Sequence, residues 1–162
     1  IKQYESVYGS FAPEQTKQDL ISLNIKQIKE LKNSLKSSSG SKKISLREEL
    51  VRASAETVKL QAEVYEEEVK SKIESAKEKV SQKISFLKSE AYSIAHHLPS
   101  SEVEDLLSEL SLDIAWNSVK ESNTISAASD YKNKMSQISD NLNKVADRII
   151  ESDQIGAKIF SN

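Results

Sequence analysis

The sequence contains no cysteine, one tryptophan, two prolines and three glycines among its 162 residues. Without cysteine the chain can form no disulfide, no thiolate nucleophile and no cysteine-bound zinc site. Glycine and proline are the residues that most often interrupt helices. Neither occurs between Gly40 and Pro99. The composition therefore favours long, uninterrupted helices.

The sequence also lacks a long apolar run and an excess of charge of either sign. Its 23 basic and 25 acidic residues give a net charge of −2. Because nucleic-acid-binding proteins usually carry a one-sided basic face, we expect no nucleic-acid partner. No apolar run is long enough to cross a bilayer, so we expect no transmembrane segment. The chain starts at Ile1 rather than Met, and we expect a processed N-terminus of a secreted or organelle-targeted protein.

An eleven-residue repeat of apolar positions dominates the middle of the chain, with spacings of four, three and four. Eleven residues over three turns is about 3.67 per turn, which predicts a nearly straight helix with a slight right-handed drift. Ser45 and Glu48 have the spacing of a capping box. We therefore expect one helix over 45–98, about 75 Å long or more at about 1.5 Å per residue. The repeat positions are Val58, Ala62, Tyr65, Val69, Ile73, Ala76, Val80, Ile84, Leu87, Ala91, Ala95 and Leu98.

The remaining sequence predicts three shorter helices. A second capping-box spacing, at Ser101 and Glu104, opens one of them. A polar break at 122–124 precedes the last, whose apolar spacing alternates between three and four, typical of left-handed packing. The expected segments are an aromatic N-terminal flap at 1–12, helices at 13–36, 45–98, 101–121 and 124–151, and a tail at 152–162. The apolar row of the last helix is Ala128, Tyr131, Met135, Ile138, Leu142, Val145 and Ile149.

These helices predict a single all-α domain, an elongated antiparallel bundle or coiled coil built on the long eleven-residue-repeat helix. The short turn at Pro99 brings the next two helices back along the C-terminal half of that helix. We therefore expect a three-helix bundle at that end. The helix at 13–36 pairs with the other half, which leaves a thinner two-helix region.

No constellation of residues points to catalysis or to metal binding. His96 and His97 are adjacent, so on a helix they point about 100° apart and cannot share one ligand set. The acidic run at 66–68 has no glycine-centred loop of the calcium-binding kind, and its spacing to Lys70 and Lys72 favours a solvated helix face. We therefore expect no enzyme, no cofactor and no metal.

The helix expected at 101–121 carries two opposed apolar stripes, and one of them is the strongest candidate for an interaction surface. Leu112, Trp116 and Val119 lie on the side that the bundle does not need. Tryptophan is favoured at binding hot spots. The alternative is burial within the chain, beneath the aromatic flap or beneath the tail at Ile159 and Phe160. The candidate surface comprises Leu112, Trp116, Val119, Tyr4, Tyr8 and Phe11.

The sequence therefore predicts a non-enzymatic structural or adaptor protein that presents helical faces to a protein partner or self-assembles as a homo-oligomer. The alternative is a secreted, exchangeable helical carrier of lipid or of a small apolar ligand, because eleven-residue amphipathic repeats also coat lipid. The stripe is narrow and rich in valine and alanine, whereas lipid-surface helices present a wide face of large side chains. This favours packing over lipid binding.

Overall fold

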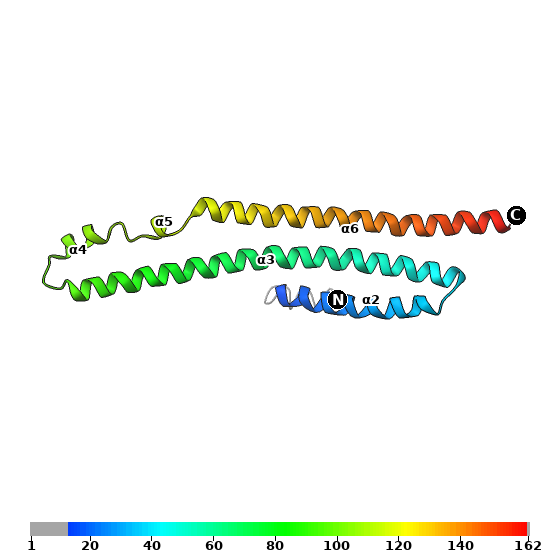
Figure 1. The fold of residues 1–162 in the computed structure, drawn as a ribbon, viewed down its shortest axis with the longest axis horizontal. Coiled ribbons are helices and arrows are strands. Elements are labelled where there is room, and N and C mark those ends of the chain that lie inside the picture. Colours follow the sequence, from blue (N-terminus) through cyan, green and yellow to red (C-terminus); the bar gives the residue numbers. More distant parts are fainter. Residues whose placement is uncertain (1–12, 162) are drawn as a thin grey trace. The chain divides into compact units, whose positions relative to one another are not determined.

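The computed structural model describes residues 13–161, which form helices joined by turns with no strand among them. The all-α fold expected from composition is confirmed. Tyr4, Tyr8 and Phe11 lie outside the described residues. Within 13–161, no helix combines the length and apolarity needed to cross a membrane. The helices are α2 (Pro13–Lys36), α3 (Gly40–Ile94), α4 (Ser100–Leu107), α5 (Leu112–Ala115) and α6 (Ser118–Ser161), shown in Figure 1.

Helix α3 is a single uninterrupted helix of 55 residues, which confirms the continuity expected from the repeat. It begins five residues earlier than expected, at Gly40, whose φ of 64° lies in the left-handed region that glycine adopts without strain. The expected capping box is therefore wrong, because Ser45 and Glu48 lie inside the helix. Glu48 instead accepts a hydrogen bond from Arg52 at 2.9 Å. The helix ends at Ile94, ahead of Pro99.

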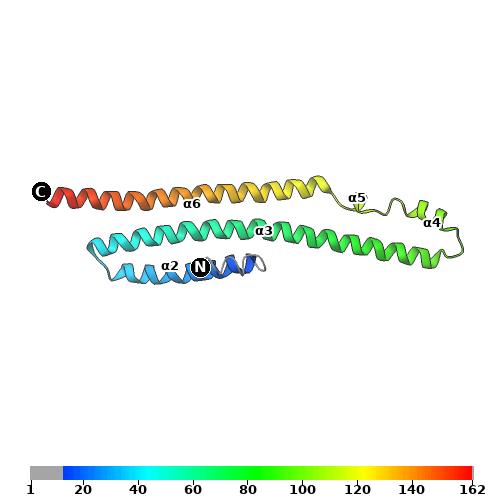
Figure 2. The same cartoon turned by 180° about the vertical axis from the view of Figure 1, so that it is seen from behind.

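The chain divides into two compact units, and the expected single elongated domain stays a prediction. The first unit holds α2, α3 up to Glu67 and α6 from Ser129. Within this unit α3 lies between α2 and α6, as both ribbon views show (Figures 1 and 2). Three helices thus pack together, but at the N-terminal half of α3. The expected two-helix region at that half is wrong, because α6 extends far enough to pack there as well.

Small side chains fill the contacts of the first unit. On one face of α3, Ala53, Thr57 and Val64 are buried, and on the opposite face Ala55 and Ala62 are 0% and 2% exposed. Helix α6 contributes Ser139 at 3% and Ala146 at 0%. Short side chains allow close approach of helix backbones but bury little apolar area. Among the described residues, no large side chain falls below 2% exposure.

The structure buries different rows from those expected. Along the eleven-residue repeat Ala62 and Ile84 are buried, whereas Tyr65 and Leu87 are 47% and 40% exposed. The physical reason in the first unit is that α3 has neighbours on two faces, so burial is shared between two rows. On α6, the residues buried in the structure include Ser139 and Ala146, in place of several of the large apolar residues that were expected to be buried. The large residues left half-exposed are Tyr131, Ile138 and Val145.

The second unit, from Glu68 to Ala128, does not contain the helix expected at 101–121. That helix is replaced by α4 and α5, because Ser108 bonds back to the Asp105 carbonyl through its hydroxyl at 2.8 Å. Ser111 is then extended, with φ −130° and ψ 158°. Serine competes with helical hydrogen bonding in this way.

Helix α6 starts before and ends after the limits expected from sequence. Asn117 caps it, since its Oδ1 accepts the Lys120 backbone N–H at 3.0 Å. The expected break at 122–124 is wrong, because those residues are helical and Thr124 bonds to the Lys120 carbonyl at 2.7 Å. The helix also continues through Gly156 to Ser161.

Candidate interaction surface

The three described residues of the candidate surface do not form one helical face. Leu112 begins α5, Trp116 follows its end with extended backbone (φ −117°, ψ 127°), and Val119 lies in α6. The stripe expected at 112, 116 and 119 required one continuous helix. Val119 is 68% exposed, while Leu112 and Trp116 are half-buried.

Trp116 is anchored within its own unit. Its indole Nε1 donates a hydrogen bond to Oε2 of Glu121 at 2.5 Å, and Nζ of Lys77 lies 3.6 Å from the same oxygen. Together with Ile73, the indole lines a groove of about 250 Å³. Trp116 thus connects the segment after α5 to α3 and α6, while its side chain remains half-buried.

A larger candidate surface lies in the first unit, along one edge of the α3–α6 pair. We call it the apolar strip. On each helix its residues recur every seven positions, which keeps them close to one side of a helix. The apolar strip consists of Ile44, Val51, Val58 and Tyr65 on α3, and Tyr131, Ile138 and Val145 on α6.

The two rows of the apolar strip run side by side in antiparallel register. The rings of Tyr65 and Tyr131 meet edge to face, with centroids 5.1 Å apart and an interplanar angle of 67°. Seven and fourteen residues further from each tyrosine come Val58 opposite Ile138 and Val51 opposite Val145. Val51 and Val145 line the same groove, which supports this register.

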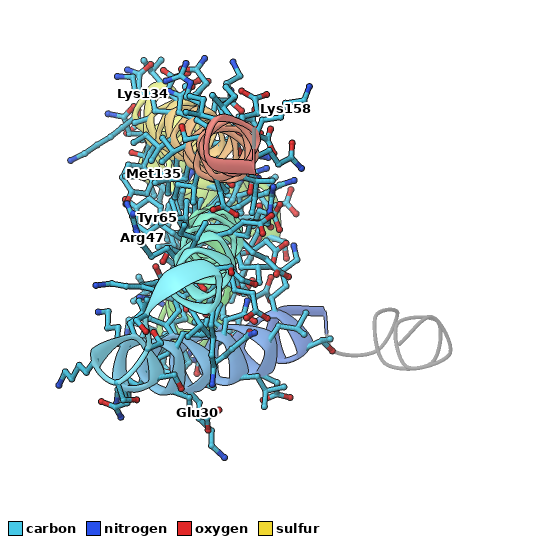
Figure 3. The ribbon with its side chains drawn as sticks, turned by 90° about the vertical axis from the view of Figure 1, so that its right-hand side faces the viewer. Glu30, Arg47, Tyr65, Lys134, Met135 and Lys158 are labelled. Carbon is cyan, nitrogen blue, oxygen red and sulfur yellow. The ribbon has the colours of Figure 1, made fainter. Side chains whose placement is uncertain are left out.

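The apolar strip is open to solvent. Tyr65, Tyr131, Ile138 and Val145 are between 42% and 47% exposed. Figure 3 shows the labelled residues Tyr65, Met135 and Arg47 on one side of the molecule's ribbon. Half-exposed aromatic and branched side chains in one continuous row are typical of a surface that contacts another chain.

The other edge of the α3–α6 pair is polar and closed by ion pairs. Arg52 bridges Glu48 at 2.9 Å and Asp147 at 2.8 Å, while Lys132 Nζ lies 3.2 Å from Oε1 of Glu66. The hydrogen bond that Arg52 donates to Asp147, followed by the one that it donates to Glu48, raises the pKa of Arg52. These pairs leave the apolar strip as the uncovered edge.

Helix α2 is held to α3 by a second cluster of charges. Lys17 contacts both Glu67 and Glu63. Burial alone would lower the pKa of Lys17, but the hydrogen bonds and negative charges of Glu67 and Glu63 together raise it above the ordinary value. Lys17 therefore stays protonated at neutral pH, and its share of the stability is lost as alkaline pH rises through that raised pKa.

At its Ile44 end the apolar strip widens into a groove. Two connected hollows of about 650 and 480 Å³ share Arg47, Val145 and Ile149. Leu35, Ile44, Leu50 and Val51 complete the apolar part of the wall. We call this feature the basic groove, because four cationic residues also line it. They are Lys36, Lys43, Arg47 and Arg148, with Asp153 the one acidic residue among the lining groups.

Sequence reasoning identified five of the seven residues of the apolar strip and assigned them to the packed rows of the bundle. Tyr131, Ile138 and Val145 belong to the apolar row expected to pack inside the bundle. On α3, Val58 and Tyr65 belong to the eleven-residue repeat, whereas Ile44 and Val51 precede the repeat and were missed. The signal that could have identified this row is the seven-residue spacing of Ile44, Val51, Val58 and Tyr65.

The described residues contain no group of three or more His, Asp or Glu side chains placed to hold a metal ion. His96 and His97 follow the end of α3 as an exposed edge-to-face pair, with His96 Nδ1 3.2 Å from the Ser93 carbonyl. The candidate site is thus a surface. The chain matches no protein-family model, no curated protein and no solved structure.

Proposed function

We propose that this protein is a non-enzymatic structural protein that self-assembles through the apolar strip. The observation that carries the proposal is the contrast between the two edges of the α3–α6 pair. One edge is closed by ion pairs of Arg52 and Lys132, whereas the other exposes large apolar side chains in a continuous row.

Completing the burial of these side chains supplies a driving force for association. A half-exposed isoleucine or tyrosine gains about 1 kcal/mol when its remaining surface leaves water. Tyr65, Tyr131, Ile138 and Val145 together can therefore offset part of the entropy lost on association. Tyrosine is also a residue type enriched at the energetic centres of interfaces.

Sedimentation velocity over a wide concentration range tests the proposal. The strip variant combines Tyr131→Ser with Ile138→Ser. We expect the wild-type chain to form a larger species as concentration rises, and the strip variant to weaken this association at least about tenfold. Because these side chains are half-exposed, helicity by circular dichroism should remain close to that of the wild type.

Leu23→Ser on α2 is the matched control, since Leu23 is also a large apolar residue and is 62% exposed outside the apolar strip. Its association should equal that of the wild type. A wild-type chain that sediments as a monomer at every concentration contradicts the proposal. Equal loss of association in the strip variant and in Leu23→Ser contradicts the assignment to the apolar strip.

A second candidate function, a carrier of amphiphilic anions, is favoured by the basic groove. Ile44, Val145 and Ile149 offer an apolar wall, and Arg47 and Arg148 offer positive charge beside it. We expect a carrier to gain helicity, or to shift the Trp116 emission to the blue, when mixed with anionic phospholipid vesicles. Unchanged spectra, together with concentration-dependent mass, favour the self-assembling structural protein.

A further inference from the structure

Charge is segregated along this nearly neutral chain. Residues 31–47, around the turn between α2 and α3, contain five Lys or Arg and no Asp or Glu. Residues 89–119 contain six Asp or Glu and no Lys or Arg. The near-zero net charge hides these two opposite stretches.

The basic stretch supplies most of the positive charge of the basic groove. Lys36, Lys43 and Arg47 come from residues 31–47, and Arg148 is added by α6. All four side chains are exposed, and within the described residues none forms an ion pair. The groove therefore combines uncompensated positive charge with an apolar wall.

The opposite combination occurs in residues 100–116, which we call the acidic segment. Its carboxylates are exposed, and within the described residues they form no ion pair. The same segment carries two exposed apolar side chains, Leu106 at 74% and Ile114 at 68% exposure. The carboxylates of the acidic segment are Glu102, Glu104, Asp105, Glu109 and Asp113.

We propose that the acidic segment of one copy binds in the basic groove of a second copy. This inference rests on the proposed self-assembly and adds to it a second contact between copies, distinct from the apolar strip. Leu106 and Ile114 meet the apolar wall formed by Ile44, Val145 and Ile149, while the carboxylates face the four cations. The contact joins two different surfaces, so it is heterologous and produces a closed ring or an open chain of copies.

Charge complementarity favours a second copy as the occupant over a lipid. The acidic segment carries five negative charges and two exposed apolar side chains within 17 residues. The basic groove presents four cations and one carboxylate, Asp153, beside apolar residues. Opposite potentials of this kind select partners and fix their register.

Charge reversal tests the contact. The groove variant combines Lys43→Glu with Arg47→Glu, and the segment variant combines Glu104→Lys with Glu109→Lys. Measured by sedimentation velocity, each variant alone should associate at least about tenfold more weakly than the wild type, because attraction is replaced by repulsion. An equimolar mixture should recover association, since the acidic segment of the groove variant then meets the intact basic groove of the segment variant.

The control variant combines Lys26→Glu with Lys29→Glu, two exposed lysines of α2 outside the groove, and should associate like the wild type. Mixture recovery is the decisive result, because a folding defect in either variant cannot produce it. A mixture that stays dissociated overturns the inference. A wild-type chain that is monomeric at every concentration and binds to anionic vesicles also overturns it.

The strip variant separates this inference from the proposed function. If the Tyr131→Ser and Ile138→Ser strip variant loses association while both charge-reversed variants keep it, the role of the apolar strip in assembly is supported and the charged contact is contradicted. If the charge-reversed variants lose association and the strip variant keeps it, the charged contact stands and the role of the apolar strip falls. A wild-type chain that stays monomeric and binds no vesicles overturns both.

Discussion

Alanine decides how closely the helices of the first unit approach. Ala55 and Ala146 have no exposed surface, although each has only one side-chain carbon. A residue of this size is fully buried only where two helix backbones lie close together. Larger residues in the same helices, such as Ile138 and Val145, consequently lie at the edge of the contact and not within it.

Enlarging one of these alanines should therefore separate the helices. We expect Ala146→Leu to lower the free energy of unfolding by about 1 to 3 kcal/mol, because the added atoms have no space. Ala127→Leu, at an exposed position of the same helix, should change it by less than about 0.5 kcal/mol. Urea unfolding followed by circular dichroism measures both, and equal effects would refute close packing at Ala146.

In the second unit, Ile84 is buried and Leu87 is 40% exposed, although they are neighbouring positions of the repeat. We therefore expect truncation of the two side chains to change the free energy of unfolding by different amounts. Ile84→Ala should cost about 2 to 5 kcal/mol, the range for truncation in a packed core. Leu87→Ala should cost less than about 1 kcal/mol. Thermal and urea unfolding decide the matter, and a larger loss at Leu87 would mean that another chain covers it.

At the scale of the elements, the long helices follow from sequence and the short ones do not. Helix α3 is predictable because no Gly or Pro interrupts residues 41–98. Apolar spacing predicts one helix at 101–121, yet the Ser108 hydroxyl and the Asn117 cap divide it. Single hydrogen bonds of this kind decide between nearly equal alternatives, so a periodic pattern cannot resolve them.

Alanine substitution of the two described glycines should change the stability of the protein in opposite directions. Gly40 has a φ of 64°, so Gly40→Ala should destabilise the protein by about 1 kcal/mol. Gly156 lies within α6 with nothing within 4 Å of an added Cβ, so Gly156→Ala should stabilise it by about 0.5 to 1 kcal/mol. Differential melting temperatures of the two variants check this, and a stabilising Gly40→Ala would contradict the geometry at the start of α3.

For the molecule as a whole, the all-α class of fold is predictable from apolar periodicity, whereas the exposed surface is not. Apolar periodicity identifies which residues share a helix face, such as Tyr131, Ile138 and Val145. It does not identify which neighbour covers that face, because the cover depends on how the helices pack. On α6 the small residues Ser139 and Ala146 are buried, whereas the large apolar residues Tyr131, Ile138 and Val145 lie half-exposed at the edge of the helix contact. This displacement is why the apolar strip was assigned to the core.

The most direct test of the apolar strip uses the absence of cysteine from the sequence. Ile138→Cys places a single thiol on the apolar strip, and Lys144→Cys places one at an exposed position of α6 outside it. The alkylation rate of each thiol is measured from dilute to concentrated protein. We expect the rate at position 138 to fall at least about tenfold on association, because an interface excludes solvent from its centre, and the rate at 144 to stay constant. Equal rates at both positions over the whole range, in protein whose mass increases with concentration, would show that self-assembly does not use the apolar strip.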